Sequence, residues 1–157
     1  MGELTVDTAA PDDVEAVVDL VAGLFREDGG RHDPTMNVDW PSGEDAGAYY
    51  AALVGDPDAV LMVAKVHDRP VGYLVGKLRE ADDFRTVRLA VLESMRVTPQ
   101  ARNAGVGGQL MDAFVAWARE HRAVRAVVTA YAGNEAAQRF YARHGFTRHS
   151  VTLWTEL

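Results

Sequence analysis

The chain contains no cysteine among its 157 residues. This absence excludes disulfide bonds, thiolate metal ligands and cysteine nucleophiles, and it is typical of cytoplasmic proteins, so a cytoplasmic location is expected. The sequence also lacks an apolar run of about 18 residues, so no membrane span is expected. The first residues lack a basic region followed by an apolar stretch, so we expect no secretory signal.

Basic residues are outnumbered, with 16 Lys and Arg against 23 Asp and Glu and a net charge of −7. A general nucleic-acid binder is normally basic, so no nucleic-acid partner is expected. Residues 1–60 carry 14 acidic and two basic side chains, a net of −12, whereas residues 61–157 carry nine acidic and 14 basic, a net of +5. This asymmetry indicates either two ligands of opposite charge or charges scattered over solvated faces.

The five histidines lack the spacing of zinc ligands, so no metal is expected.

The length fits one domain over residues 1–157, and the apolar fraction of 48% allows a real core. Apolar periodicity predicts strands at 3–7, 60–66, 71–78, 86–97, 124–130 and 151–154, and helices at 11–25, 44–54, 105–120 and 134–144. Residues 26–47 contain Gly, Pro, Asp and Asn without periodicity before that second helix, which predicts an irregular loop. The order β-α-α-β-β-β-α-β-α-β predicts a mixed α/β fold with a mostly antiparallel sheet flanked by helices.

The most informative segment runs from Val97 to Gly108, where a predicted strand ends, a loop follows and a helix begins. N–H groups at a helix start have no helical partner, and the helix dipole places positive potential there. Glycines allow an anion to approach the backbone, so the segment predicts a phosphate cradle, with a tight turn as the plainer alternative. The third glycine of the dinucleotide fingerprint is missing, and so is the Gly-Lys-Ser/Thr of a Walker A loop.

The pattern Arg102-x-x-Gly105-x-Gly107, after a strand ending in Val-x-Pro, resembles the acetyl-CoA loop of the GNAT family of N-acetyltransferases. The segment from Asn134 to Phe146 is similar to the family's second signature, an Asn followed by a helix that reads Phe-Tyr-x-x-x-Gly-Phe. The resemblance spans most of the chain. It implies the GNAT acyl-CoA N-acyltransferase fold and acetyl-CoA as co-substrate.

The resemblance also implies cofactor-binding residues. The backbone of Met95, Arg96 and Val97 would pair with the pantetheine arm, and Asn134 would contact the cofactor beside the following strand. The pyrophosphate would be held by the N–H groups of Arg102, Asn103, Ala104, Gly105, Val106, Gly107 and Gly108. Five arginines in the basic part of the chain suit the phosphates of CoA, although each could instead be a solvated surface residue: Arg96, Arg102, Arg139, Arg143 and Arg148.

Two side chains are candidate catalytic residues. Glu93 is the only carboxylate in the apolar run 87–97, and burial of a lone carboxylate is costly. The family commonly uses a glutamate on this strand as a base acting through water; the alternative for Glu93 is a salt bridge with Arg88 or Arg96. Tyr141 matches the family tyrosine that protonates the CoA thiolate, and its alternative is a core aromatic beside Phe140. By the same resemblance, the N–H of Val97 would donate to the thioester carbonyl.

The leading helices and their loop usually wall the acceptor site in this family. Here that region is acidic, with Glu27, Asp28, Asp33, Asp39, Glu44 and Asp45. It also contains Trp40, which would line an acceptor pocket, lie on the surface or pack in the core. We therefore expect a cationic small-molecule amine as acceptor. Two alternatives stay open: a protein lysine or N-terminal acetyltransferase, and a non-catalytic acyl-CoA sensor. The resemblance also suggests a homodimer, without identifying its interface.

Overall fold

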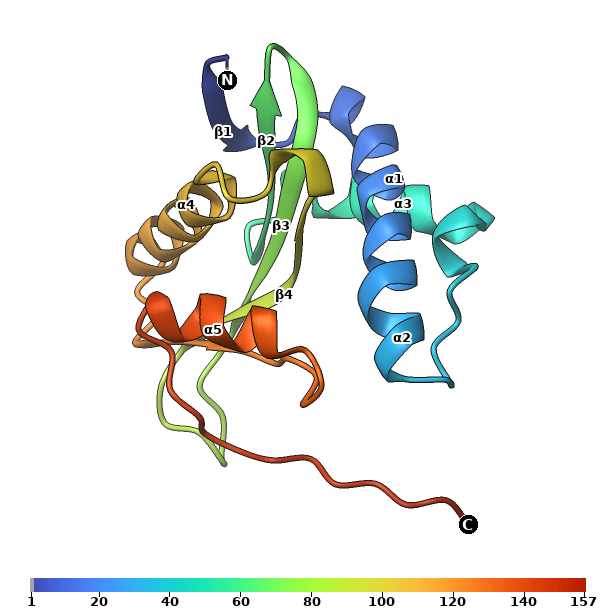
Figure 1. Ribbon diagram of the computed structural model, residues 1–157. Coiled ribbons are helices and arrows are strands. Elements are labelled where there is room, and N and C mark those ends of the chain that lie inside the picture. Colours follow the sequence, from blue (N-terminus) through green and yellow to red (C-terminus); the bar gives the residue numbers. More distant parts are fainter. Residues whose placement is uncertain (1) are drawn as a thin grey trace.

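The computed structural model describes residues 2–157 and contains a five-stranded sheet in the order β1-β2-β3-β4-β5 (Figure 1). The strands are β1 (Leu4–Thr8), β2 (Ala59–Val66), β3 (Arg69–Arg79), β4 (Leu89–Val97) and β5 (Arg125–Val128). The first four pair antiparallel and β5 pairs parallel to β4, so the predicted mostly antiparallel sheet is confirmed. The strands predicted at 60–66 and 71–78 form a hairpin, and its turn residues His67 and Asp68 have φ of 51° and 61°, as a two-residue hairpin turn requires.

Helices cover both faces of the sheet. On one face, α1 (Val14–Leu24) and α3 (Glu44–Leu53) build a core that includes Val17, Tyr50 and Tyr73. On the other face, α4 (Val106–Glu120) packs Leu110 and Phe114 against the sheet, and α5 (Glu135–Arg143) follows β5 (Figure 1). Single 3-10 turns lie at Pro11–Asp13, Trp40–Ser42 and Pro99–Ala101. The two-sided arrangement agrees with the predicted fold class.

The first helix is longer than predicted, because the expected loop from residue 26 begins as a π-helical turn (Phe25–Gly29) and continues as α2 (Gly30–His32). A Cβ on Gly29 would lie 3.0 Å from Met36 Cγ, and one on Gly30 would lie 2.7 Å from Val38 Cγ1. These glycines therefore let the following loop pack closely on the helix and do not end it. The added turns bring Glu27 to Arg96 and Arg102, and they bring Asp28 and His32 to the segment before α5.

Strand β4 begins at Leu89, later than the predicted residue 86, and it contains a β-bulge. Val75 pairs with Ser94 and Gly76 pairs with Leu92, so Glu93 has no partner on β3. The extra residue shifts the alternation of side chains. Leu92 precedes the bulge and Met95 follows it, yet both contribute to the core beneath α4. The regular alternation predicted for the whole strand is therefore wrong beyond Glu93.

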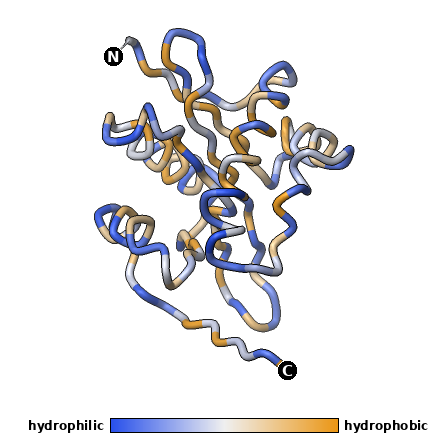
Figure 2. Tube along the Cα trace, turned by 45° about the vertical axis from the view of Figure 1, so that its right-hand side comes forward, coloured by the Kyte–Doolittle hydropathy of each residue, from blue (hydrophilic) through white to orange (hydrophobic). Residues whose placement is uncertain are grey.

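The predicted last strand at 151–154 is absent from the described chain. The segment after α5 runs away from the rest of the molecule in both views (Figures 1 and 2), and within it Val151, Leu153 and Trp154 are 71%, 88% and 70% exposed. A strand forms only where another strand accepts its hydrogen bonds, and this segment pairs with no strand of its own chain. No helix within residues 2–157 is long and apolar enough to cross a membrane.

Candidate active site

Strands β4 and β5 pair over only part of the length of β4. Leu89–Leu92 pair with Arg125–Val128, and no pair joins the two strands beyond Leu92. The backbone of Met95, Arg96 and Val97 therefore pairs with β3 on one side and has no strand partner on the other. An extended ligand can hydrogen-bond to such an open edge as an added strand does. The structure thus places the three predicted pantetheine-binding residues at an accessible edge.

The predicted phosphate cradle lies at the N-terminus of α4. Gly105 adopts the left-handed conformation (φ 83°) immediately before the helix, and residues 102–105 are exposed. Within residues 2–157, the N–H groups of Asn103, Ala104 and Gly105 donate to no protein acceptor. Those of Val106, Gly107 and Gly108 occupy the first helical positions, which lack intrahelical partners. The residues fit a pyrophosphate held by backbone donors.

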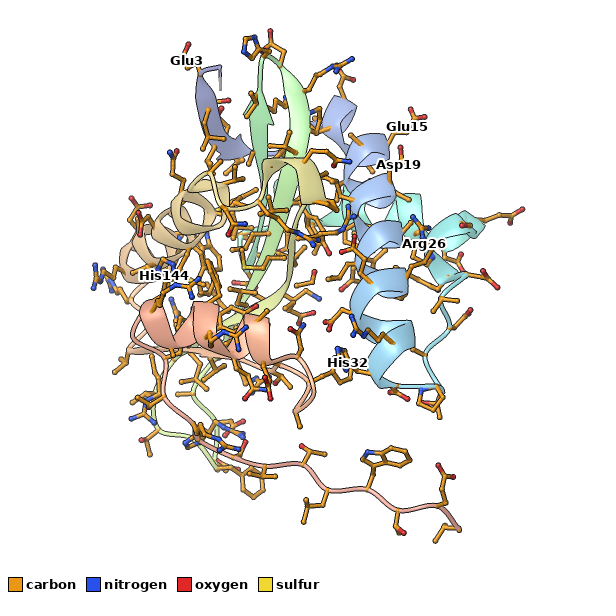
Figure 3. The ribbon with its side chains drawn as sticks, in the orientation of Figure 1. Glu3, Glu15, Asp19, Arg26, His32 and His144 are labelled. Carbon is orange, nitrogen blue, oxygen red and sulfur yellow. The ribbon has the colours of Figure 1, made fainter. Side chains whose placement is uncertain are left out.

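The cradle lies next to α5 and the end of β4. A Cβ on Gly107 would lie 3.1 Å from Phe140 Cε2 and 3.9 Å from Met95 Cε, and one on Gly108 would lie 3.8 Å from His144 Cε1. Figure 3 shows His144 at the end of α5 that faces α4. The two signature segments of the sequence therefore meet in space, although α4 and α5 are separated by β5.

Arg96 and Arg102 converge on Glu27 at the end of the first helix. Arg96 Nη2 lies 2.7 Å from Glu27 Oε1, and Arg102 Nη2 lies 2.7 Å from Glu27 Oε2. The hydrogen bond from Arg96, followed by that from Arg102, lowers the pKa of Glu27 below its usual value. Arg102 Nε also donates to the carbonyl oxygen of Val97 at 2.9 Å. Two of the five arginines predicted to face an anionic cofactor, Arg96 and Arg102, thus share an acidic partner in this structure.

Asp28 connects the first helix to the beginning of α5. Asn134 Oδ1 accepts from the N–H of Ala137 at 3.0 Å and so caps α5, while its Nδ2 donates to Asp28 Oδ1 at 2.8 Å. His32 Nε2 lies 3.6 Å from the same carboxylate oxygen. Figure 3 shows His32 on α2, on the side toward the loop before α5. Sequence reasoning missed this link because it placed Asp28 in a loop.

A cavity of about 540 Å³ lies beside these residues. It is lined by Leu24, Phe25, Asp28, Gly29, Met36, Trp40, Tyr49, Tyr50, Val75, Glu93, Ser94, Thr129 and Tyr131. Asp28 and Glu93 are the carboxylates in this lining. The predicted acidic wall is therefore wrong, because of its six residues only Asp28 reaches the cavity and Glu27 binds the two arginines.

Aromatic rings form much of the cavity wall. Trp40 stacks on Phe25 with ring centroids 5.8 Å apart and meets the edge of Tyr49 at 5.7 Å. On the other side, Tyr131 stacks on His32 at 5.4 Å. Trp40 thus lines the cavity and also packs on neighbouring rings. In the sequence, the consecutive tyrosines at 49 and 50 in a predicted helix were the feature from which this aromatic wall could have been predicted.

The bulge in β4 brings two consecutive residues, Glu93 and Ser94, to the cavity. The Glu93 side chain is 39% exposed, so the expected burial of this carboxylate is wrong. Neither arginine considered as its partner binds it, because Arg88 pairs with Glu80 and Arg96 pairs with Glu27. Instead, Lys77 Nζ lies 3.7 Å from Glu93 Oε1.

Lys77 also donates to the Tyr49 hydroxyl at 2.8 Å. That hydrogen bond, together with the charge of Glu93, raises the pKa of the Lys77 ammonium. Lys77 therefore links the carboxylate of the bulge to the aromatic wall.

Tyr141 packs between Phe140 and Phe146, with ring centroids at 5.5 Å and 5.8 Å, against the core beneath α4. Burial, and then the negative charge of Asp28, raise the pKa of the Tyr141 hydroxyl to about 12. The phenol therefore keeps its proton at neutral pH, as a proton donor must. Among the described residues, Tyr141 does not line the cavity, whereas Asp28, whose charge acts on its hydroxyl, does.

The raised pKa of Tyr141 predicts a stability that depends on pH in alkaline solution. The folded protein holds the phenolic proton up to pH 12, whereas an unfolded chain releases it near pH 10. The contribution of Tyr141 to the free energy of unfolding is therefore fully present below pH 10. It is lost as the pH rises toward 12, by about 1 kcal/mol per pH unit. Urea unfolding at pH 9, 10 and 11 should show a shallower decline for Tyr141→Phe than for the wild type. Parallel declines would contradict the assigned environment.

The chain matches the family described as "Acetyltransferase (GNAT) family" over residues 19–146. It therefore belongs to the GNAT family of acetyltransferases, as its two signatures predicted. Membership of this family makes it an acetyltransferase. No curated protein sequence matches this chain. Within residues 2–157, no group of three or more His, Asp or Glu side chains could hold a metal ion.

Several solved structures share the fold. A transcriptional regulator from Bacillus halodurans C-125 has 22% identity and a TM-score of 0.80, covering 99% of this chain and 100% of its own. AAC(6')-Iy in complex with the bisubstrate analogue CoA-S-monomethyl-acetylneamine has 16% identity and a TM-score of 0.78, covering 99% of each chain. An aminoglycoside acetyltransferase from an uncultured soil metagenomic sample, in complex with sisomicin, has 18% identity and a TM-score of 0.72, covering 98% and 96%. At these sequence identities, the similarity to the solved structures establishes a shared fold and nothing further.

Proposed function

We propose that this enzyme transfers the acetyl group of acetyl-CoA to the primary amine of a small cationic molecule held in the aromatic cavity. The observation that carries the proposal is the position of β4 between the two sites. Glu93 and Ser94 line the cavity, and the three residues after them have the open backbone edge. One short stretch of strand thus joins an acceptor site to a donor site, which direct transfer between two bound substrates requires.

The donor site uses backbone groups more than side chains. The N–H groups of the 102–108 segment would hold the pyrophosphate, and the edge at Met95–Val97 would pair with the pantetheine arm. The N–H of Val97 would donate to the thioester carbonyl, and Asn134 would lie beside the cofactor. Arg102 must release the Val97 carbonyl oxygen for this pairing, because its Nε donates to that oxygen here.

Acetyl-CoA supplies the acetyl group as a thioester, whose carbonyl carbon the amine attacks. Glu93 accepts a proton from the bound ammonium through water, so that a neutral nitrogen forms the new C–N bond. Once the C–N bond forms, the nitrogen carries an extra proton, which it loses to water. As the C–S bond breaks, Tyr141 donates its phenolic proton to the leaving sulfur. The raised pKa of Tyr141 suits this role, because the phenol is protonated before the reaction and a proton from solvent can restore it.

The cavity favours an acceptor with one positive charge and an apolar body. Its lining combines two carboxylates with the rings of Phe25, Trp40, Tyr49, Tyr50 and Tyr131. Aromatic faces attract cations and also bury apolar groups. The aminoglycoside acetyltransferases that share this fold are named for polycationic acceptors. A polycationic acceptor has more ammonium groups than the two carboxylates of this cavity can pair with. The lining therefore supports a compact acceptor with a single amine.

The test begins with calorimetric titration by acetyl-CoA and continues with an amine panel in which released thiol is detected. We expect an arylalkyl monoamine to exceed sisomicin and a lysine peptide by at least about 10-fold in kcat/KM, given the worth of aromatic contacts. Trp40→Leu should raise the KM of that monoamine about 10-fold and leave acetyl-CoA binding unchanged. A preference for the peptide would indicate a protein acetyltransferase. Stoichiometric acetyl-CoA binding without turnover of any amine would indicate a sensor.

A further inference from the structure

One of the two lysines in the chain lies beside the carboxylate proposed as the base. The two are Lys65 and Lys77, and all other basic side chains except the histidines are arginines. Lys77 Nζ lies 3.7 Å from Glu93 Oε1 and donates to the Tyr49 hydroxyl at 2.8 Å. Both of these partners line the cavity. The ammonium of Lys77 therefore occupies a position beside Glu93 that resembles the one an acceptor ammonium needs before it loses a proton.

Lys77 is also close to the donor site along the sheet. Val75, two residues before it on the same face of β3, lines the cavity and pairs with Ser94. Met95, the next residue of β4, begins the open edge proposed for the pantetheine arm. Two residues of a strand span about 7 Å, and a lysine carries its amine on a flexible four-carbon stem. Rotation of this stem can therefore carry Nζ from Glu93 toward the beginning of the open edge.

We propose that Lys77 is a self-acetylation site, whose Nζ takes the acetyl group from acetyl-CoA bound to the same molecule when no amine fills the cavity. This inference rests on the proposed function, because it uses the same donor and the same base. It adds a covalent modification of the enzyme itself, at one named nitrogen.

The transfer to Lys77 follows the steps proposed for a free amine. Glu93 accepts a proton from the Lys77 ammonium, and the neutral nitrogen attacks the thioester carbonyl carbon. After the C–N bond has formed, the nitrogen loses a second proton to water. The C–S bond breaks, and Tyr141 gives the sulfur a proton that it regains from solvent. The products are acetyl-lysine, CoA as the thiol and one proton released to solvent.

The contacts of Lys77 make this reaction slower than turnover of a free amine. The hydrogen bond with Tyr49, together with the charge of Glu93, raises the pKa of Lys77, so its nitrogen is seldom neutral. A bound acceptor amine also competes with Lys77 for Glu93. Self-acetylation should therefore proceed when acetyl-CoA is present without acceptor. It replaces the ammonium by a neutral amide, which leaves the cavity more negative and favours a cationic acceptor.

Lys65 is a matched control within the same chain. Its side chain is 32% exposed, as is that of Lys77, and its Nζ lies 2.8 Å from Asp13 Oδ1. The hydrogen bond with Asp13 raises the pKa of Lys65 as well. The two lysines lie at opposite ends of the hairpin, because Lys65 pairs with Pro70 beside the turn and Lys77 pairs with Ala59. Similar reactivity toward acetyl-CoA in solution is therefore expected, and the proximity of Lys77 to the cavity distinguishes them.

Peptide mass mapping of the full chain after incubation with acetyl-CoA alone tests the proposal. We expect acetylation of Lys77 at least about 10-fold faster than that of Lys65, because only Lys77 lies beside a base and the donor site. The rate constant should not change when the protein is diluted, since donor and acceptor are in one molecule. Equal modification of both lysines, an unmodified Lys77, or a rate constant that falls on dilution would overturn the proposal.

Glu93→Gln separates catalysed transfer from reaction in solution. Without the carboxylate, Lys77 loses its proton more easily, so a reaction in solution would become faster. A reaction that uses Glu93 as its base should instead become at least about 10-fold slower, while acetylation of Lys65 stays the same. Glu80→Gln, at a carboxylate paired with Arg88, should change neither rate. Faster acetylation of Lys77 in Glu93→Gln would refute the catalysed step.

The same samples, assayed with the amine panel, distinguish this inference from the proposed function. A saturating monoamine should protect Lys77 from acetylation, because it occupies the cavity and Glu93. Turnover of the amine with Lys77 unmodified in its absence would overturn self-acetylation and leave the proposed function intact. Acetylation of Lys77 without turnover of any amine would support the inference and overturn the proposed acceptor. Absence of acetyl-CoA binding would overturn both.

Discussion

Replacing Gly107 with leucine should weaken acetyl-CoA binding by at least about 100-fold in a calorimetric titration. The leucine side chain would cover the first turn of α4, where three successive N–H groups lack helical partners. Hydrogen bonds to a charged group contribute about 1.5–3 kcal/mol each, so the loss of two donors gives this factor. If backbone N–H groups hold the pyrophosphate, as proposed, acetyl-CoA affinity should depend more on this glycine than on an arginine side chain.

Two further variants make this result interpretable. Gly47→Leu, in α3, is the matched control, because a Cβ at Gly47 meets no atom within 4 Å, and it should bind acetyl-CoA normally. A Cβ at Gly107 lies close to Phe140, so the leucine also strains the contact between α4 and α5. Gly105→Val perturbs the same loop without that contact, because Gly105 requires φ of 83° and has open space around it. Normal binding by both loop variants would exclude the cradle.

Local patterns in the sequence were sufficient for most of the fold and for the position of the glycine loop before α4, whereas the binding roles of its residues stay predictions. Helix α4, the hairpin and the glycine loop depend on residues close together in the chain, and each lies where periodicity and turn chemistry predicted it. The family signatures also brought α5 to the correct place. The fold class therefore followed from short-range information.

The acceptor side depended on contacts between distant residues, which periodicity does not report. Glu27 meets Arg96 and Arg102 across 69 and 75 positions, and the carboxylate thereby leaves the predicted acidic wall. Gly29 and Gly30 lie in the segment predicted as an irregular loop, but the structure places them in helical turns against which the next loop packs closely. The bulge at Glu93 also could not be predicted, because an apolar run does not show where one strand has an extra residue. The strand predicted at 151–154 failed because strand formation needs a partner, which its own chain does not supply.

Replacing Glu93 with glutamine should lower kcat/KM for the amine about 100-fold at neutral pH and leave acetyl-CoA affinity unchanged. A positioned base contributes a factor of this size or more. The side chain is 39% exposed and 3.7 Å from Lys77, so the loss of its charge should not unfold the protein. Glu80→Gln is the control, because Glu80 is an exposed carboxylate paired with Arg88 and should retain full activity.

The pH dependence separates the role of a base from a merely structural role. As the pH rises toward the pKa of the free amine, a larger fraction of the acceptor is already neutral in solution. The reaction then depends less on a base in the enzyme. The deficit of Glu93→Gln should therefore shrink with rising pH, whereas a variant that only disturbs the cavity would keep a constant deficit. Tyr141→Phe provides the contrast, because loss of a proton donor to sulfur is not relieved by a neutral amine, so its lower kcat should persist. If both variants respond alike to pH, the division of roles between the bulge of β4 and α5 is wrong.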